Sequence, residues 1–136
     1  ENYNRQHQDL RSEEGIKYGD VIEGVNFNYA KNITAVNAIN LASLGWSSPE
    51  PKNVKIGGIV EPSTKLKWDI SKDNNIIGYK IYWRKTTSPF WENSKLVGKV
   101  NNYKLNGIVI DNYLFGVSSI SEKGYESVVV FPKDIF

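Results

Sequence analysis

Short stretches of alternating apolar and polar residues, separated by turn residues, dominate the chain after residue 47. In residues 64–68, for example, Thr64, Leu66 and Trp68 share one side and two lysines share the other. Alternation at every second residue is typical of a strand with one buried face. About seven such strands, with a turn every 8–12 residues, predict a sandwich of two antiparallel sheets.

Two further strands should contribute inward-facing side chains at every second position: Ile77, Tyr79, Ile81 and Trp83 in one, and Tyr113, Phe115 and Val117 in the other. Residues 122–125 (EKGY) predict a hairpin turn, because glycine readily adopts the positive φ that tight turns require. Residues 127–131 then predict the last strand. Together these strands should enclose a single hydrophobic core.

Residues 25–46 have a different period, because apolar residues return at every third or fourth position. This spacing predicts one amphipathic α-helix, preceded by a polar segment over residues 1–24. Asn26 can cap the helix, since its side-chain oxygen can accept a free N–H of the first turn. Gly45 suits the left-handed position that ends a helix, and Trp46 could then fold back on Leu41.

The residue types present exclude several kinds of site and partner. The chain has no Cys, so it cannot form disulfides, thiol nucleophiles or cysteine-type zinc sites, and its single His cannot supply a two-histidine metal site. A net charge of +2, with the lysines scattered, argues against a nucleic-acid partner. No apolar run approaches the roughly 20 residues of a membrane span. Since residue 1 is Glu and Met is absent, we expect a processed product or fragment.

Several motifs of the strand region match one family. Pro51 stands before the first strand, Trp68 ends the second, residues 78–84 (GYKIYWR) form the third, and residues 113–117 (YLFGV) form the sixth. These residues resemble those of a fibronectin type III domain over about residues 49–132. The resemblance implies a mostly β, immunoglobulin-like sandwich with Trp68 and Tyr79 in its core.

The start of the chain has a second motif. Residues 2–9 (NYNRQHQD) are followed by Tyr18-Gly19-Asp20 and then by the long helix. This order resembles the end of the catalytic domain in zinc-dependent aminopeptidases of peptidase family M twenty-eight, in bacterial members with a trailing fibronectin domain. The resemblance covers about residues 1–46 and implies that residues 47–136 are the appended sandwich. It also implies that His7 is the last metal ligand of the intact parent.

Four residues are candidate functional residues. His7 can serve only as one ligand of several, because a zinc site needs three or four, and a plain exposed or loop-packed histidine is the alternative. Asp9 could orient the imidazole through a hydrogen bond, or be an ordinary surface carboxylate. Phe90 and Trp91 follow Pro89 and could form an exposed patch that recognises peptide or sugar. The alternative for this pair is packing against the rim of the sheet.

Two functions follow from these observations. In the first, the chain is the C-terminal fragment of a secreted or periplasmic zinc aminopeptidase, itself non-catalytic and without a cofactor of its own. In the second, it is a stand-alone fibronectin module for binding or adhesion. For the first function the natural partner is the rest of the catalytic domain. Without that partner, we expect the helix of residues 26–44 to pair with a second copy, the alternatives being folding back on the sandwich and fraying.

Overall fold

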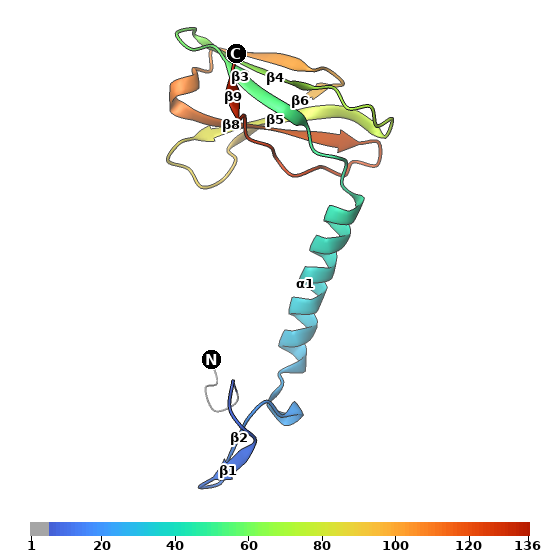
Figure 1. The fold of residues 1–136 in the computed structure, drawn as a ribbon, viewed down its shortest axis with the longest axis vertical. Helices are drawn as coiled ribbons and strands as arrows, with labels where there is room; N and C mark the ends of the chain where they lie inside the picture. Colours follow the sequence, from blue (N-terminus) through green and yellow to red (C-terminus); the bar gives the residue numbers. More distant parts are fainter. Residues whose placement is uncertain (1–5) are drawn as a thin grey trace. The chain divides into compact units, whose positions relative to one another are not determined.

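The structure, a computed structural model, describes residues 6–136, and the chain divides into two compact units, Glu1–Ala42 and Ser43–Phe136 (Figure 1). The first unit contains the hairpin of β1 (Arg11–Glu13) and β2 (Ile16–Tyr18), a 3-10 turn η1 (Ile22–Gly24) and most of α1 (Phe27–Trp46). The second unit contains the end of α1 and all the remaining strands. None of the described helices combines the length and hydrophobicity that a membrane span requires.

The second unit is a sandwich of two sheets. One sheet has the strand order β7-β4-β3-β9 and the other β6-β5-β8. The strands are β3 (Lys52–Gly57), β4 (Ser63–Asp69), β5 (Ile76–Lys85), β6 (Asn93–Gly98), β7 (Asn102–Asn106), β8 (Tyr113–Ser121) and β9 (Asp134–Ile135), with a 3-10 turn η2 (Ile110–Asn112) before β8. All neighbours pair antiparallel except β9, which runs parallel to β3. This arrangement confirms the immunoglobulin-like, fibronectin type III sandwich.

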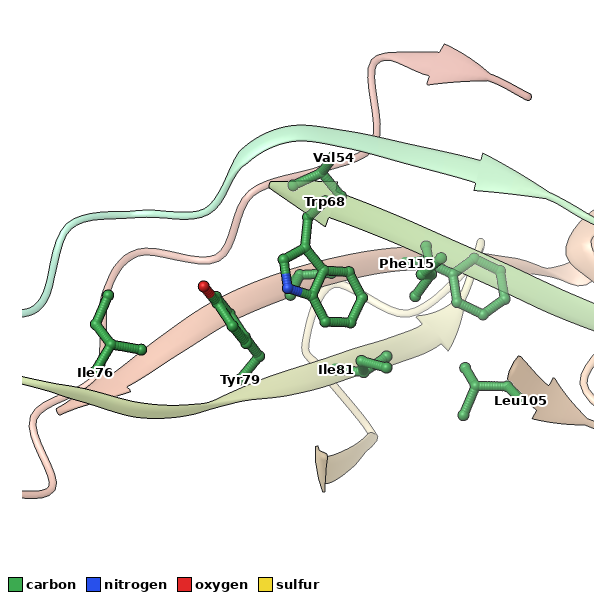
Figure 2. Close-up of a cluster of buried hydrophobic side chains, with 9 residues drawn as sticks. Val54, Trp68, Ile76, Tyr79, Ile81, Leu105 and Phe115 are labelled. Carbon is green, nitrogen blue, oxygen red and sulfur yellow. The ribbon is translucent and has the colours of Figure 1, made fainter. Parts of the chain in front are cut away.

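The core lies between the two sheets (Figure 2). The expected alternation holds along β4, where Thr64, Leu66 and Trp68 are all buried. Phe115 and Val117 of β8 are buried as expected, but burial does not alternate along this strand, since residues 115–119 are all buried. Burial of these apolar side chains supplies the main driving force for folding, at about 25 cal/mol per Å² of apolar surface.

One inward position on β5 was predicted wrongly. Ile76 is 1% exposed, whereas Ile77, the expected core residue, is 53% exposed. The pairing explains the difference: β5 pairs Ile76 with Ser121 and Gly78 with Ile120, so Ile77 is an extra residue opposite no partner. Such a β-bulge reverses the alternation on one side of it, while Tyr79 and Ile81 beyond it remain inward as expected.

Helix α1 begins at the predicted cap and ends at Trp46, but Gly45 does not close it. The Tyr29 N–H donates a 3.0 Å hydrogen bond to Oδ1 of Asn26, which confirms the cap. Gly45 lies inside the helix rather than in a left-handed position after it. The chain leaves the helix at Ser47, whose backbone N–H and hydroxyl both donate to the Leu44 carbonyl, at 3.2 and 2.8 Å. The side chain of Trp46 packs on Tyr125, with ring centroids 5.6 Å apart, so its predicted contact with Leu41 is wrong.

The apolar side chains of α1 surround the helix instead of forming one stripe. Phe27 and Val36 are about two and a half turns apart, which places them on opposite sides, and both are exposed. None of the residues of α1 is buried. The expected separation into an apolar and a polar face is therefore wrong, because apolar and polar positions are interleaved around the helix axis.

The end of the chain adds two pairings to the sandwich. The predicted last strand over residues 127–131 forms one isolated bridge to β8, between Val130 and Val117, and Glu126 just before it forms another with Ile120. The short strand β9, which the alternation did not predict, then pairs with β3 through Lys55 and Ile56.

Candidate functional site

The hairpin of the first unit holds the loop that contains His7. In this hairpin Arg11 of β1 lies opposite Tyr18 of β2, and the Arg11 guanidinium lies 4.1 Å from the centre of the Tyr18 ring. The same side chain donates hydrogen bonds to Oε1 of Glu13 at 2.9 Å and to Oε1 of Gln8 at 3.1 Å. Arg11 therefore links Gln8, the neighbour of His7, to both strands.

Gly19 forms the second support of this loop. Its φ of +98° is one that glycine adopts easily, and a Cβ built on it would lie 2.7 Å from Cδ2 of Leu10 and 3.2 Å from the Gln8 carbonyl oxygen. A side chain at position 19 would thus displace residues 8–10. The two parts of the sequence motif, the His7 segment and Tyr18-Gly19-Asp20, are in direct contact through this glycine.

His7 lies at the start of the described part of the motif, since residues 2–5 are outside the residues that the structure describes. Its backbone is left-handed, with φ of 53°, and its side chain is exposed, as is that of Asp9. Within residues 6–136, no three His, Cys, Asp or Glu side chains gather closely enough to hold a metal ion. An exposed imidazole can provide one nitrogen ligand of a zinc site, and this chain's described residues do not complete such a site.

Phe90 and Trp91, the second candidate pair, have different surroundings. Phe90 lies in the loop between β5 and β6 and is 78% exposed. Trp91 is half-buried, with its ring centre 5.6 Å from that of Tyr82 and 5.3 Å from that of Phe131. A Cβ on Gly116 would lie 3.1 Å from Cη2 of Trp91, so the indole lies directly over this glycine of β8. Only Phe90 is thus available as an exposed anchor.

A polar network lies on the same sheet as the Trp91 stack. Oε1 of Glu126 accepts hydrogen bonds from the hydroxyls of Tyr82 and Ser118, the latter at 2.6 Å, and Oε2 accepts one from Nζ of Lys80 at 3.4 Å. Burial raises the pKa of the Tyr82 hydroxyl, and its hydrogen bond to Glu126 adds to the rise. Contact with the Tyr82 side chain raises the pKa of Lys80, and the Glu126 carboxylate acts in the same direction. All of these contacts hold the carboxylate in place, so we interpret the network as structural.

The sequence analysis did not find this network. Lys80 and Ser118 are directly paired across β5 and β8, and both lie at positions that alternate with core residues. Polar residues that alternate with core residues are ordinary in a sheet with one solvated face, so nothing in the sequence distinguished these two, although Ser118 is in fact fully buried. Glu126 reaches them from the segment after the hairpin turn, and only the strand register reveals that contact.

Similar curated proteins match nearly the whole chain. It is 37% identical over 133 residues to a "Probable zinc metalloprotease" of Pyrenophora tritici-repentis and 39% identical over 133 residues to a protein of that description from Leptosphaeria maculans. Each match covers 97% of this chain but only 27% and 31% of the respective relative, so the chain spans less than a third of their length. These relatives are fungal, and the expected bacterial origin is therefore not supported.

No protein-family model matches the chain. Among solved structures, a fibronectin type III domain of human collagen XX is 19% identical, covers 64% of this chain and 88% of its own, and has a TM-score of 0.48. An Fn3-like protein from Clostridium thermocellum is 15% identical, covers 65% and 94%, and has a TM-score of 0.45. The strand order described above assigns the fold. In sequence the chain is similar, along almost its whole length, to one part of fungal proteins named as probable zinc metalloproteases.

Proposed function

We propose that the chain is the C-terminal part of a zinc aminopeptidase, in which residues 1–46 complete the catalytic domain and residues 47–136 form a non-catalytic accessory domain. The observation that carries this proposal is the extent of the sequence match. A single match of 97% of the chain includes both the hairpin–helix unit and the sandwich, in proteins named as zinc metalloproteases. A stand-alone fibronectin domain would give no reason for the hairpin and helix to be part of that match.

His7 is the residue through which this chain would take part in catalysis. The neutral imidazole nitrogen is a preferred zinc ligand, and the His7 side chain is exposed on a loop braced by Arg11 and Gly19. The other ligands and the general base would come from residues outside this chain. Zinc bound there would activate a water for attack on the peptide carbonyl. Asp9 would hold the orientation of the imidazole.

Helix α1 supports a place inside a larger domain. A helix that is apolar on several sides is typical of one surrounded by other protein, and Phe27 and Val36 lie on opposite sides of α1. We expect the rest of the catalytic domain to cover α1 in the parent. The parent would be a secreted protein, as the resemblance to secreted aminopeptidases implies, and the periplasmic alternative loses its basis with fungal relatives.

The experiment uses the intact parent protein, with zinc measured by mass spectrometry and activity by release of p-nitroaniline from an aminoacyl p-nitroanilide. The proposal predicts bound zinc, cleavage of the free amino form of the substrate, and no cleavage of its N-acetylated form. His7→Ala should lose zinc and most activity, and Asp9→Asn should lose activity by about 10–100-fold. Phe90→Ala is the matched control and should leave both unchanged. Full zinc content and activity in His7→Ala would overturn the role of His7.

The alternative function, a binding or adhesion module, is favoured by one observation, the exposure of Phe90 at 78%. A large exposed aromatic side chain at a loop tip is a common anchor of protein interfaces. This function requires that the parent binds its target without bound zinc and without peptidase activity. A parent that holds no zinc and cleaves neither substrate would therefore favour the binding module over the aminopeptidase.

A further inference from the structure

A cavity of about 440 Å³ lies at one end of the sandwich and shares no residue with the His7 loop or the Trp91 stack. It lies entirely within the second unit and is lined by residues 46–49, by Asp73 and Asn75 of the loop between β4 and β5, and by residues 121–125 apart from Gly124. Its volume is within the range of roughly 300–1,000 Å³ that is typical of small-molecule sites. Neither the metal site proposed above nor the structural network uses any of these residues.

One wall of the cavity is aromatic. The rings of Trp46 and Tyr125 are 5.6 Å apart and tilted by 38°, and Trp46 is exposed although it packs on Tyr125. The C-terminal end of α1 and the hairpin turn after β8 each provide one ring. Such a pair presents apolar ring faces, together with an indole N–H and a phenol hydroxyl that can hydrogen-bond at the ring edges.

The Ser48 hydroxyl is the second, independent indication of a ligand. Ser48 is only 6% exposed, yet its Oγ has no hydrogen-bond partner within the part of the chain that the structure describes. Buried polar groups are nearly always paired, since an unpaired one costs the free energy of its lost hydration. Hydroxyls nearby are paired: that of Ser47 donates to Leu44, and that of Ser119 donates to the Pro49 carbonyl at 2.7 Å.

The remaining lining groups are polar and of mixed charge. Asp73 uses Oδ1 to accept the Asn75 N–H at 2.9 Å, and its Oδ2 takes part in none of the hydrogen bonds of the described residues. Glu122 and Lys123 are exposed residues of opposite charge. This combination of charges disfavours a strongly anionic or cationic ligand. The groups do offer both donors and acceptors, which a neutral ligand with several hydroxyls requires.

We propose that this cavity binds a neutral sugar ring. The apolar C–H face of the sugar would pack on the Trp46 and Tyr125 rings, and its hydroxyls would bond to Asp73 and Asn75. The Ser48 hydroxyl, which is covered in its present rotamer, would reach the sugar after rotation about its Cα–Cβ bond. A sugar hydroxyl both donates and accepts, so it can accept from Ser48 while it donates to a carboxylate. The ligand would be one unit of a glycan, because Trp46, which lines the cavity, is exposed to solvent.

The test is a titration of the chain, followed by NMR, with three neutral trisaccharides made of N-acetylglucosamine, glucose or mannose. We expect at least one of them to shift, in a saturable way, the Trp46 indole signal and the amide signals of Ser48, Asn75 and Tyr125. Trp46→Ala should abolish these shifts. Phe90→Ala changes an aromatic residue at the other end of β5 and should leave them intact.

Ser48→Ala separates a ligand-binding hydroxyl from a structural one. It should weaken saccharide binding by about tenfold, the usual effect of losing one hydrogen bond, while the melting temperature stays equal or rises. A lower melting temperature with unchanged saccharide binding would mean that the Ser48 hydroxyl has a structural role, and would overturn its proposed role in binding the ligand. Absence of saturable shifts with all three saccharides, or saturable shifts only with a trialanine peptide used as a second probe, would overturn the proposal.

Discussion

The indole ring of Trp68 packs against the phenol ring of Tyr79 across the centre of the sandwich, with centroids 5.3 Å apart and ring planes at 57° (Figure 2). Trp68 belongs to β4 of the four-stranded sheet and Tyr79 to β5 of the three-stranded sheet, so this contact joins the two layers. The Tyr79 hydroxyl in turn accepts the Ser71 N–H at 2.7 Å, which ties the loop after β4 to the core. Both side chains are fully buried.

Trp68→Ala should therefore destabilise the sandwich strongly. Removal of a fully buried indole leaves a cavity, and such substitutions cost about 3–5 kcal/mol. Urea denaturation followed by circular dichroism would measure this loss. Ile77→Ala is the control, because Ile77 is exposed on the bulge and should cost well under about 1 kcal/mol. Equal losses for the two variants would contradict the strand register that buries Trp68 and exposes Ile77.

Gly116→Ala should also destabilise the protein, although it adds only one methyl group. A Cβ at this position would clash with Cγ1 of Val129 and lie 3.1 Å from the Trp91 ring, so both neighbours must move. Overpacking of this kind costs about 1–3 kcal/mol. Gly45→Ala is the matched control, since nothing lies within 4 Å of that Cβ and alanine favours a helix. Thermal denaturation should give a lower melting temperature for Gly116→Ala and an equal or higher one for Gly45→Ala.

The network around Glu126 predicts a loss of stability at alkaline pH. The pKa values of Tyr82 and Lys80 are raised in the folded protein from their usual 10.0 and 10.5. A raised pKa means that the folded state holds the proton more tightly, so this stabilisation is complete below about pH 10 and is lost as the pH rises through the raised values. Urea midpoints at about pH 9 and pH 11 should show this fall, and Tyr82→Phe should show a smaller one. An identical fall in Tyr82→Phe would exclude this tyrosine as a source.

The isolated chain should self-associate through the helix of residues 26–44, because exposed apolar side chains on α1 lose contact with water when two copies pair. Sedimentation velocity at tens of micromolar would detect the dimer. Ile33→Asp should dissociate it and leave the melting of the sandwich unchanged. Asn28→Asp, which adds the same charge at a polar position about 140° around the helix from Ile33, should leave the dimer intact. A strictly monomeric wild-type chain at these concentrations would contradict the prediction.

Zinc should bind the isolated chain weakly, if at all. One His and no Cys cannot supply the three or four ligands of a tight site. Calorimetry at neutral pH should give no dissociation constant below about 1 µM. A tight one-to-one site that is lost in His7→Ala would show instead that His7 recruits carboxylate ligands from elsewhere in the chain.

The core of the sandwich could be predicted from the sequence because alternation reports burial directly. Leu66 and Trp68 on β4 and Phe115 on β8 follow a period of two, and all three are buried. The bulge at Ile77 could not be predicted in this way, since a bulge is defined by the pairing of two strands and not by one strand's composition. The role of Gly45 as the residue that closes the helix was also predicted wrongly. The helix continues through Gly45, and Ser47 ends it by donating hydrogen bonds to the Leu44 carbonyl.

The candidate sites were predictable only in part. His7 and Asp9 were proposed from a local motif and stay a prediction, whereas the contact between their loop and Gly19 crosses the hairpin and needs the structure. Ser48, which follows the end of α1, is buried, and no local pattern in the sequence indicates that burial. For Phe90 and Trp91, adjacency in sequence suggested one surface, whereas Trp91 packs over Gly116 and Phe90 is exposed.

The short strand β9 has a consequence for how the molecule behaves in concentrated solution. Lys133 and Phe136 donate backbone hydrogen bonds to the carbonyls of Val54 and Ile56, each at 3.1 Å, so the outer side of β3 is already occupied. An uncovered β3 would offer its free N–H and C=O groups to a strand of another molecule, which is how sheet edges start aggregates. Residues 133–136 thus cover this one edge of the sandwich against pairing with another molecule, and fusions or tags placed after Phe136 should be designed to leave them in place.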